Sequence, residues 1–255
     1  MNIDFHVHGK ISKKNEFNQE LFEQGMVYAK ESGLDAVCLT EHFNAPGYER
    51  MIEMIEKKYH YNGHYYCVEG MRVYPGLEVD VLGGGHILVI ASKEVIRSIY
   101  DELKDYKVKP NFIPFEKLLD LCENHRALVI GAHPFRAEHN LIEKQPLDLV
   151  LRLNALDLNA TDIQSKGYET TFDGLKTFTA QHPIPIITGS DSHYPLQLGS
   201  VYTTITGEPL SVDDIKEAID THNFKRYVSK SLMLRVDAAR HIKALIKNGH
   251  LKSTI

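Results

Sequence analysis

Histidines and carboxylates stand in this sequence at spacings that are typical of metal-binding sites. Two of the 14 histidines form His6-Val7-His8, and an aspartate and a histidine have the same separation in Asp191-Ser192-His193. Alternate positions of an extended chain place both side chains on one face. Mixed imidazole and carboxylate ligands favour Zn, Mn or Fe over Ca or Mg. Four further motifs each hold at least one ligand-type residue: Thr40-Glu41-His42, Gly76-Leu77-Glu78, Gly85-His86 and Ala132-His133-Pro134.

The chemistry that such a set of ligands supports is hydrolysis. Two or three transition-metal ions close together lower the pKa of a shared water, which then supplies hydroxide at neutral pH. The hydroxide can attack phosphorus in line with the leaving group, while the ions stabilise charge on the phosphoryl oxygens. These residues therefore predict a metal-dependent phosphoesterase.

Short runs rich in Val, Ile and Leu alternate along the chain with longer helical patterns. This alternation is typical of an α/β fold whose parallel strands are buried on both faces. Seven strands favour one barrel-like domain that covers residues 1–255, with C-terminal helices packing on the barrel. The expected strands are 3–7, 36–39, 73–77, 87–91, 128–131, 156–158 and 184–188. The expected helices cover 17–33, 48–58, 93–106, 115–124 and 168–181, one that begins at Ser211, and 236–247.

Most of the candidate ligands directly follow expected strands. The carboxyl ends of parallel strands meet at one mouth of a barrel, so side chains at these ends lie close together. His86 instead precedes its strand, and we expect the Gly83-Gly84-Gly85 turn to return it to the same mouth. Asp157, in Asp157-Leu158-Asn159, is a weaker candidate. A single histidine at a strand end is usually structural, but that explanation would have to hold independently at six places, so the pattern predicts a metal site.

In their order along the chain, these motifs resemble those of the PHP family, the polymerase and histidinol phosphatase domains. The resemblance covers roughly residues 1–205. It implies a distorted seven-stranded β/α barrel of TIM-like, PHP type, with up to three divalent metals at its C-terminal face and phosphoester hydrolysis as the usual activity. The stretches that carry it are Asp4-Phe5-His6-Val7-His8, Leu39-Thr40-Glu41-His42, Gly76-Leu77-Glu78, Gly85-His86, Gly131-Ala132-His133-Pro134 and Gly189-Ser190-Asp191-Ser192-His193.

The resemblance also implies how the ligands are divided among the metal ions. One ion would bind His6, His8, Glu78 and Asp191, a second His42 and His193, and a third Glu78 as a bridge with His86 and His133. The family usually has an Asp or His shortly after His-x-His, whereas this chain has Gly9-Lys10-Ile11-Ser12-Lys13-Lys14-Asn15-Glu16. The second ion is therefore expected to be weakly held, or completed by water or substrate, unless Glu16 substitutes for the missing ligand.

Candidate phosphate-binding and catalytic groups lie beside these motifs. Arg136 closely follows Ala132-His133-Pro134, and a guanidinium binds phosphate through two parallel hydrogen bonds. A solvated surface arginine is the alternative interpretation. The lysines of residues 10–14 fit a solvated loop better than a basic lip. We take Asp191, His193 and Arg136 as the catalytic candidates; the aromatic stretch at 59–66 is either a base-stacking loop or a hairpin.

Composition excludes several other classes of protein. The 255 residues are 43% hydrophobic and 25% charged, as in ordinary globular proteins. With a net charge of −5 the chain has no strongly basic face, so wholesale electrostatic binding of nucleic acid is not expected. The expected partner, from the candidate site, is a small phosphorylated substrate. No apolar run is long enough to span a membrane. The N-terminal residues lack signal-peptide features, and three cysteines are too few for a disulfide framework, which together indicate the cytoplasm.

Two other functions fit part of the pattern. An amidohydrolase-like metal hydrolase also begins with His-x-His on a barrel strand, but it normally has a bridging Lys or Glu in mid-barrel and ends with a lone Asp. Here Glu78 comes at the third strand, and His193 adds a ligand after Asp191. A non-catalytic metal-binding module is favoured by the missing ligand after His8, and it is opposed by the ligands present at the other positions.

Overall fold

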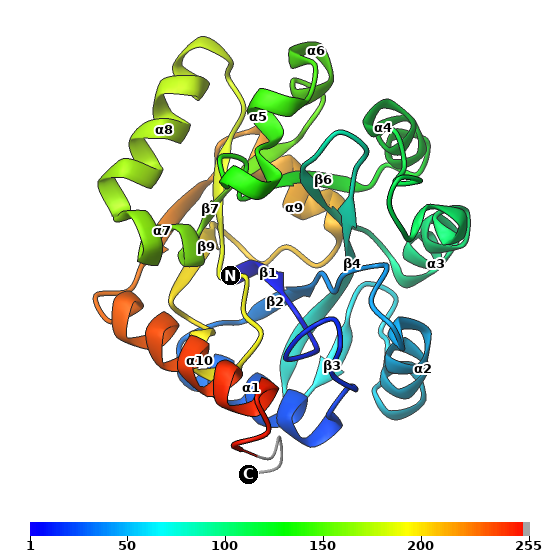
Figure 1. Ribbon diagram of the computed structural model, residues 1–255, viewed down its shortest axis with the longest axis vertical. Coiled ribbons are helices and arrows are strands. Elements are labelled where there is room, and N and C mark those ends of the chain that lie inside the picture. Colours follow the sequence, from blue (N-terminus) through cyan, green and yellow to red (C-terminus); the bar gives the residue numbers. More distant parts are fainter. Residues whose placement is uncertain (252–255) are drawn as a thin grey trace.

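Seven strands follow one another around a barrel in the computed structural model, which describes residues 1–251 (Figure 1). The last strand returns to the first, because the Asp191 amide donates to the His6 carbonyl over 2.8 Å and the His8 amide to the Ser192 carbonyl over 2.9 Å. The predicted seven-stranded α/β barrel is confirmed. The strands are β1 (Asn2–Val7), β2 (Ala36–Leu39), β4 (Met71–Asp80), β5 (His86–Ile90), β6 (Leu128–Ala132), β7 (Ala155–Asn159) and β8 (Ile186–Gly189).

The strand β5 runs against its neighbours, so the expectation that all the strands are parallel was wrong. It pairs antiparallel with both β4 and β6, whereas the other neighbouring pairs of the barrel are parallel. The β4–β5 hairpin turns through Gly83-Gly84-Gly85, whose φ angles of +87°, +121° and +118° suit glycine alone. Because β5 is buried along its whole length, its apolar run resembles that of a parallel strand.

Three further strands extend the sheet outside the barrel, and the sequence analysis did not predict them. β3 (Tyr66–Val68) pairs with β4, β9 (Val201–Ile205) pairs antiparallel with β1, and β10 (Phe224–Val228) pairs antiparallel with β9. β3 has only three residues, β9 alternates buried and half-buried positions, and β10 is exposed along its middle, so none contains the continuous buried apolar run that marks the barrel strands. The aromatic stretch at 59–66 is a hairpin, in which Tyr61 and Tyr66 form an antiparallel bridge.

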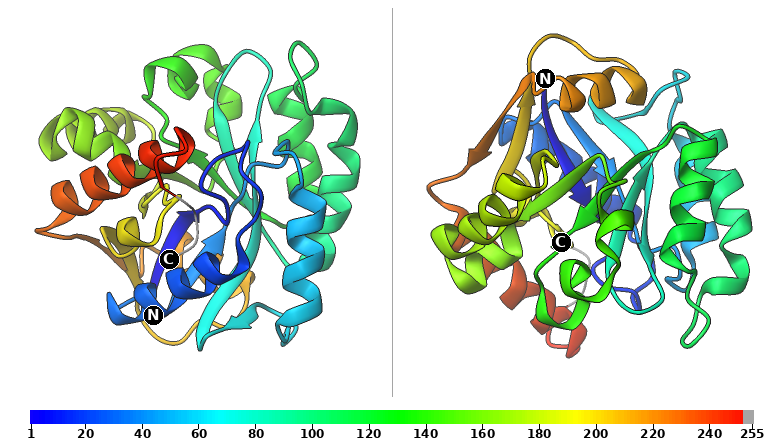
Figure 2. Two further views of the ribbon diagram at one scale, coloured as in Figure 1. Left: turned by 60° about the horizontal axis from the view of Figure 1, so that its bottom comes forward. Right: turned by 90° about the horizontal axis from the view of Figure 1, so that it is seen from above.

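The helices surround the barrel and cover one of its ends (Figures 1 and 2). Several of them begin at side chains that accept helix amides, such as Asn18, Ser92 and Ser211. None of the described helices is long and apolar enough to cross a membrane. They are α1 (Gln19–Glu31), α2 (Tyr48–Lys58), α3 (Lys93–Glu102), α4 (Phe115–Asn124), α5 (Leu141–Lys144), α6 (Leu147–Val150), α7 (Ala160–Lys166), α8 (Tyr168–Gln181), α9 (Val212–Asp220) and α10 (Leu232–Lys247), with 3₁₀ turns η1 (Lys104–Tyr106), η2 (Ala137–His139) and η3 (Pro195–Gln197).

Buried apolar side chains fill the barrel and leave its carboxyl-end mouth to polar residues. One cluster joins strand residues such as Phe5, Tyr74 and Leu88 to Ile215 and Ile219 of α9. The same cluster contains Met1 and Ile205, so α9 closes the end of the barrel at which β1 begins. A second cluster lies between the strands and the surrounding helices. The open end is therefore the one at which β1 finishes, where His6 and His8 lie.

Candidate metal centre

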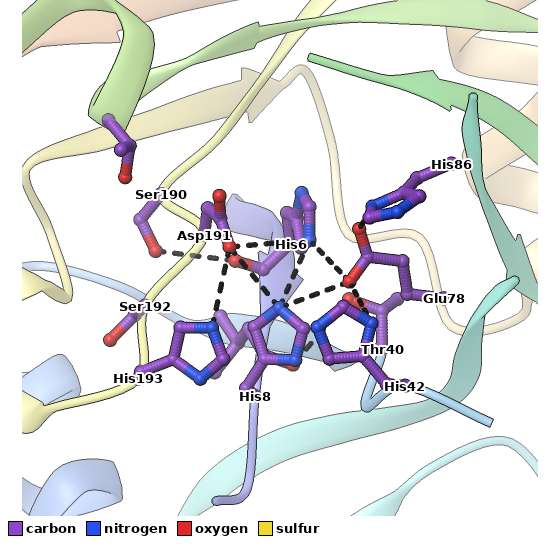
Figure 3. Close-up of polar contacts among 12 residues, drawn as sticks. His6, His8, Thr40, His42, Glu78, His86, Ser190, Asp191, Ser192 and His193 are labelled. Carbon is purple, nitrogen blue, oxygen red and sulfur yellow. Dashed lines mark hydrogen bonds and ion pairs between the residues drawn. The ribbon is translucent and has the colours of Figure 1, made fainter. Parts of the chain in front are cut away.

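Four side chains from three strand ends point toward one spot at the mouth of the barrel (Figure 3). The Nε2 atoms of His6 and His8 are 3.2 Å apart, and Nε2 of His8 is 3.2 Å from Oδ1 of Asp191. Oε2 of Glu78 lies 3.6 Å from Nε2 of His6 and 3.4 Å from Nε2 of His8. Lone-pair atoms gathered at these distances can share one cation. This is the set that the sequence assigned to the first ion.

Glu78 also faces a second group of histidines. Its Oε1 atom is 2.6 Å from Nδ1 of His86 and 3.2 Å from Nε2 of His133, and its Oε2 atom is 2.9 Å from Nδ1 of His42. His86 reaches this position because β5 is antiparallel, which puts the first residue of the strand at the same mouth as the last residues of its neighbours. The sequence analysis placed His86 correctly at this mouth.

His193 completes the outer side of the mouth together with His42. Its ring stacks on that of His8, with centroids 4.0 Å apart, and its Nδ1 donates to the Lys10 carbonyl over 2.9 Å. That hydrogen bond leaves Nε2 with its lone pair directed away from the loop. His8, His42 and His193 thus form a group whose nitrogens lie within 4.8 Å of one another.

The loop of residues 9–16 adds no ligand to this group. Within that loop, which is described throughout, no imidazole or carboxylate joins a set of candidate ligands. The Glu16 carboxylate lies beside Gly47 instead, and Asn15 accepts a hydrogen bond from the Ser12 hydroxyl at 2.6 Å. Lys10 is buried, and its ammonium donates to the carbonyls of Lys13 and Pro46. Glu16 therefore does not substitute for the missing ligand.

Three carboxylates lie behind His6, His8 and His86, each beside the ring nitrogen that does not face Glu78. Asp157 Oδ2 is 3.2 Å from Nδ1 of His6, Glu41 Oε1 is 3.5 Å from Nδ1 of His8, and Asp80 Oδ1 is 3.0 Å from Nε2 of His86. In metal sites such partners fix the tautomer and orientation of the ligating ring. The sequence analysis missed Asp80, although its position two residues after Glu78 on β4 places both side chains on one face.

Electrostatics in this mouth favour a bound cation. Burial alone would raise the pKa of Glu78, but His42, His86 and His6 hold it well below its usual range. Burial would lower the pKa of His6, yet Asp191 and Glu78 raise it well above the ordinary value. Burial and the Arg136 charge lower the pKa of His133 to about 3, which keeps its lone pair available. Carboxylates that stay ionised among imidazoles call for positive charge between them.

Unsatisfied polar atoms provide a test of whether a metal ion fits. Nδ1 of His133 is buried and makes no hydrogen bond with any described residue, and Oε2 of Glu78 and Nδ1 of His42, although 2.9 Å apart, are buried without a hydrogen bond. Buried polar atoms are normally paired, so atoms left without a partner indicate a group that belongs there. Imidazole nitrogens and carboxylate oxygens around one space match the donor set of Zn, Mn or Fe.

Strained backbone marks two of the same residues. Only five described non-glycine residues have positive φ, and they include His133 at +30° and Asp191 at +57°. Such conformations cost about 1–3 kcal/mol each and persist where the surroundings impose them. Just before Asp191, a Cβ atom on Gly189 would lie 2.5 Å from Cβ of His6. Glycine there allows β8 to approach β1 closely enough to bring Asp191 to the histidines.

Arg136 lies at the mouth with most of its donors occupied. Its Nη2 is 3.0 Å from Oδ2 of Asp191 and donates to Asn159 Oδ1 over 3.0 Å, and its Nε donates to Asp162 Oδ1 over 2.8 Å. Its Nη1 has no hydrogen-bond partner in the described part of the chain. Arg136 thus holds Asp191 in place and keeps one free donor group.

A cavity of about 400 Å³ covers these residues. Beside the candidate ligands it is lined by His139, whose ring centroid is 4.0 Å from that of His86, and by basic residues of α10. Nothing in the sequence singled out His139, and α10 was expected only to pack on the barrel. An adjoining cavity contains Lys13, whose ammonium lies 3.2 Å from Asp80.

Comparison with known proteins relates this site to a fold family. Residues 176–222 match a family model described as PHP-associated. The crystal structure of PsfC from Pseudomonas syringae PB-5123 is similar over 96% of this chain and 98% of its own, with 19% identity and a TM-score of 0.80. That of the lesion-specific endonuclease PfuEndoQ from Pyrococcus furiosus aligns over 89% of this chain but 57% of its own, with 20% identity and a TM-score of 0.64.

A Bifidobacterium adolescentis protein named as a metal-dependent phosphoesterase aligns over 85% of this chain and 95% of its own, with 16% identity and a TM-score of 0.51. At these identities the likeness is one of fold. No curated protein matches the chain. The matched segment 176–222 includes β8 and Asp191-Ser192-His193, so the resemblance to the PHP family is confirmed by a model match at one of its motifs and by the fold.

Proposed function

Since the chain is similar to PHP-type proteins in its fold and in the order of its motifs, we propose that it is a metal-dependent hydrolase acting on a small phosphomonoester or nucleotide. The observation that carries the proposal is the position of Glu78. One buried carboxylate faces His6 and His8 on one side and His86 and His133 on the other, and its Oε2 atom has no hydrogen bond.

The residues divide into sets that would hold two or three ions. His6, His8, Glu78 and Asp191 would hold one, Glu78 with His86 and His133 another, and His42 with His193 a third beside His8. Zn, Mn and Fe are the metals that suit these donors. When bound, such ions supply a hydroxide at neutral pH and neutralise charge on a phosphoryl group.

The chain's own residues orient the substrate and handle protons. Arg136 keeps its Nη1 group free at the mouth for a phosphoryl oxygen, while its other nitrogens hold Asp191. Burial keeps the pKa of His193 well below its usual range, so its ring does not retain a proton at neutral pH and its Nε2 lone pair stays available to hold an ion. A cavity of about 400 Å³ is the size of a site for a small molecule.

The test is a metal analysis joined to a substrate panel. Protein stripped of metal would be reloaded with Mn, Zn or Fe and assayed against p-nitrophenyl phosphate, nucleoside monophosphates, N-acyl amino acids and a DNA duplex with an abasic site. We expect transition metal at more than one ion per chain and metal-dependent release of phosphate from the monoesters. Cleavage of the amides alone would identify an amidohydrolase, cleavage of the duplex alone would favour an endonuclease, and no turnover with metal bound would favour a binding module.

Because Asp191 is proposed both to bind metal and to be held by Arg136, Asp191→Ala should abolish turnover while the protein stays folded. A folded Asp191→Ala variant with near-wild-type activity would contradict the proposal. Asp220→Ala is the control, because Asp220 is exposed at the end of α9, at the opposite end of the barrel.

A further inference from the structure

Basic side chains of α10 reach the mouth from outside the barrel. Arg240, Lys243 and Lys247 line the same cavity as Glu78, Asp191 and five histidines (His42, His86, His133, His139 and His193). Their spacing of three and then four residues places them on one face of the helix. Lys243 and Lys247 also line the adjoining cavity that holds Lys13. One helix therefore presents a row of positive charges to the candidate metal centre.

Specific contacts hold α10 in this position, beside α7 and the η3 turn (Figure 1). Gln164 of α7 donates to Asp237 Oδ1 over 2.6 Å and accepts a hydrogen bond from Arg240. Arg235 donates to the Leu198 carbonyl over 2.8 Å. Val236 and Ala239 are buried on the packed side. The row of positive charges is thus fixed relative to the mouth.

Lys243 is the central residue of this row. It is half-buried, yet it makes no hydrogen bond or ion pair with any residue from 1 to 251. The nearby carboxylates already have partners: Asp191 binds Arg136, and Glu41 accepts the backbone amides of Lys10 and His42. Burial, which Asp191 opposes and Lys247 reinforces, lowers the pKa of Lys243 to about 8. An ammonium held without an acceptor beside a cavity is a site for an anion.

We propose that Lys243 and Lys247 bind a second anionic group of the substrate, so that the substrate is a phosphoester whose alcohol portion carries a carboxylate or another phosphate. The phosphoester part of this inference rests on the proposed function, whereas the anion-binding part rests on α10 alone. The candidate metal ligands and Arg136 come from the barrel, and Lys243 approaches from α10, so a substrate between them meets cations at two separate points.

Binding of phosphonates that cannot be hydrolysed tests the anion-binding part directly. Propylphosphonate has no second anion, 3-phosphonopropionate adds a carboxylate, and propane-1,3-bisphosphonate adds a second phosphonate. Calorimetry on the full chain loaded with Mn should show at least about tenfold tighter binding of the second or third compound than of the first, as a charge-assisted contact predicts. Whichever of the two binds more tightly identifies the anionic group.

Variants of Lys243 test whether this residue causes the preference for a second anionic group. In Lys243→Ala the affinity ratio between the dianionic compound and propylphosphonate should fall to about threefold or less. Lys243→Arg should restore most of it. Lys230→Ala is the matched control, because Lys230 is exposed just before α10 and lines neither cavity. Should Lys243→Ala not fold, Lys243→Gln replaces it, since the amide keeps most of the side chain's length.

Two results would overturn the inference: equal affinities for the three compounds in the wild-type protein, or a preference that survives in both Lys243→Ala and Lys243→Gln. Failure of the proposed function has a different signature. The binding preference and its dependence on Lys243 would then remain, while the metal-loaded protein would hydrolyse neither 3-phosphoglycerate nor glycerol 3-phosphate, a matched pair that differs in one carboxylate.

Discussion

His6 and His8 lie at the end of a barrel strand with side chains fully buried, whereas His42 and His193 lie beyond their strands with 12% and 14% of their side chains exposed. The inner pair is backed by the carboxylates of Asp157 and Glu41, while His193 is backed only by the backbone carbonyl of Lys10. A carboxylate behind an imidazole makes the ring more basic and fixes its orientation. On the proposed function, the inner half of the mouth would therefore hold an ion more tightly than the outer half.

Arg136 contacts Asp191 of the inner half, but the lysines of the mouth lie in its outer half. Lys13 lies beside Asp80 in the adjoining cavity, which forms the outer cavity of the mouth. Lys243 and Lys247 reach that outer cavity from α10. No lysine lies within 4.0 Å of a carboxylate among the inner ligands of the described chain. The inner half therefore gathers carboxylates, which suit the proposed metal ions, and the outer half gathers lysines, which suit the proposed anionic substrate.

Glu78→Gln should have the largest effect on metal binding and on the rate. Its carboxylate contacts histidines of both inner sets, so the neutral amide removes charge from two ion positions at once. We expect the loss of both inner ions and a drop in kcat of about 10³-fold or more. Elemental analysis and steady-state kinetics measure the effect, with Glu208→Gln on the exposed surface as the control. A variant that retains its metal and its rate would show that Glu78 is structural.

Asp157→Asn tests the carboxylate behind His6. The amide can still accept a hydrogen bond but no longer carries the charge that supports the imidazole. Metal affinity at the inner position should fall by about 10- to 100-fold, while affinity at the outer position is unchanged. Competition with a fluorescent chelator measures both. An equal loss at the two positions would indicate a general disturbance of the mouth.

Mild chelation tests the difference in ion affinity itself. Two histidines with no anionic ligand hold an ion less firmly than a set with two carboxylates, so one ion should leave first and activity should fall with it. Adding Mn or Zn should restore the activity. Asn15 lines the outer cavity with His42 and His193, and Asn15→Asp should tighten retention of that ion by about tenfold. Loss of all ions with a single affinity would remove the distinction between the two halves.

The smallest expected effect is the pH dependence of the outer half. Lys243 faces Asp191, Glu41, Arg136 and Lys247. Burial lowers its pKa to about 8. As pH rises through this value the ammonium loses its charge, so the affinity for 3-phosphonopropionate should fall by about three- to tenfold relative to propylphosphonate. Lys243→Arg should remove this fall, because arginine stays charged. The same fall in that variant would assign the titration to another group.

The sequence predicted the barrel and the meeting of the eight candidate ligands at its mouth because both depend on local patterns. Each barrel strand is an apolar run, and each ligand follows or begins such a run. The direction of β5 was not predictable, since a strand buried on both faces has the same composition whichever way it runs. The strand predicted at 184–188 begins only at Ile186, because Pro185 cannot donate to a neighbouring strand.

The α10 lysines of the outer half could not be predicted from the sequence. Lys243 lies 50 residues beyond His193, and nothing local indicates that α10 returns to the mouth. Its position depends on tertiary contacts such as the one between Gln164 and Asp237. Asp80 could have been predicted from the alternation of side chains along β4. The position of His139 depends on the turn after His133, which the sequence does not indicate.

The closure between β1 and β8 has a consequence for how the protein folds. The pairing joins segments about 180 residues apart, as in the bond from Asp191 to the His6 carbonyl, whereas Glu78 and His86 meet within one hairpin. Local hairpins form early, and long-range pairings come late and reopen first. Candidate ligands stand on both sides of this seam, so on the proposed function an ion would bind only once the two segments have met. Metal would then stabilise the closed barrel by mass action as well as supply the chemistry.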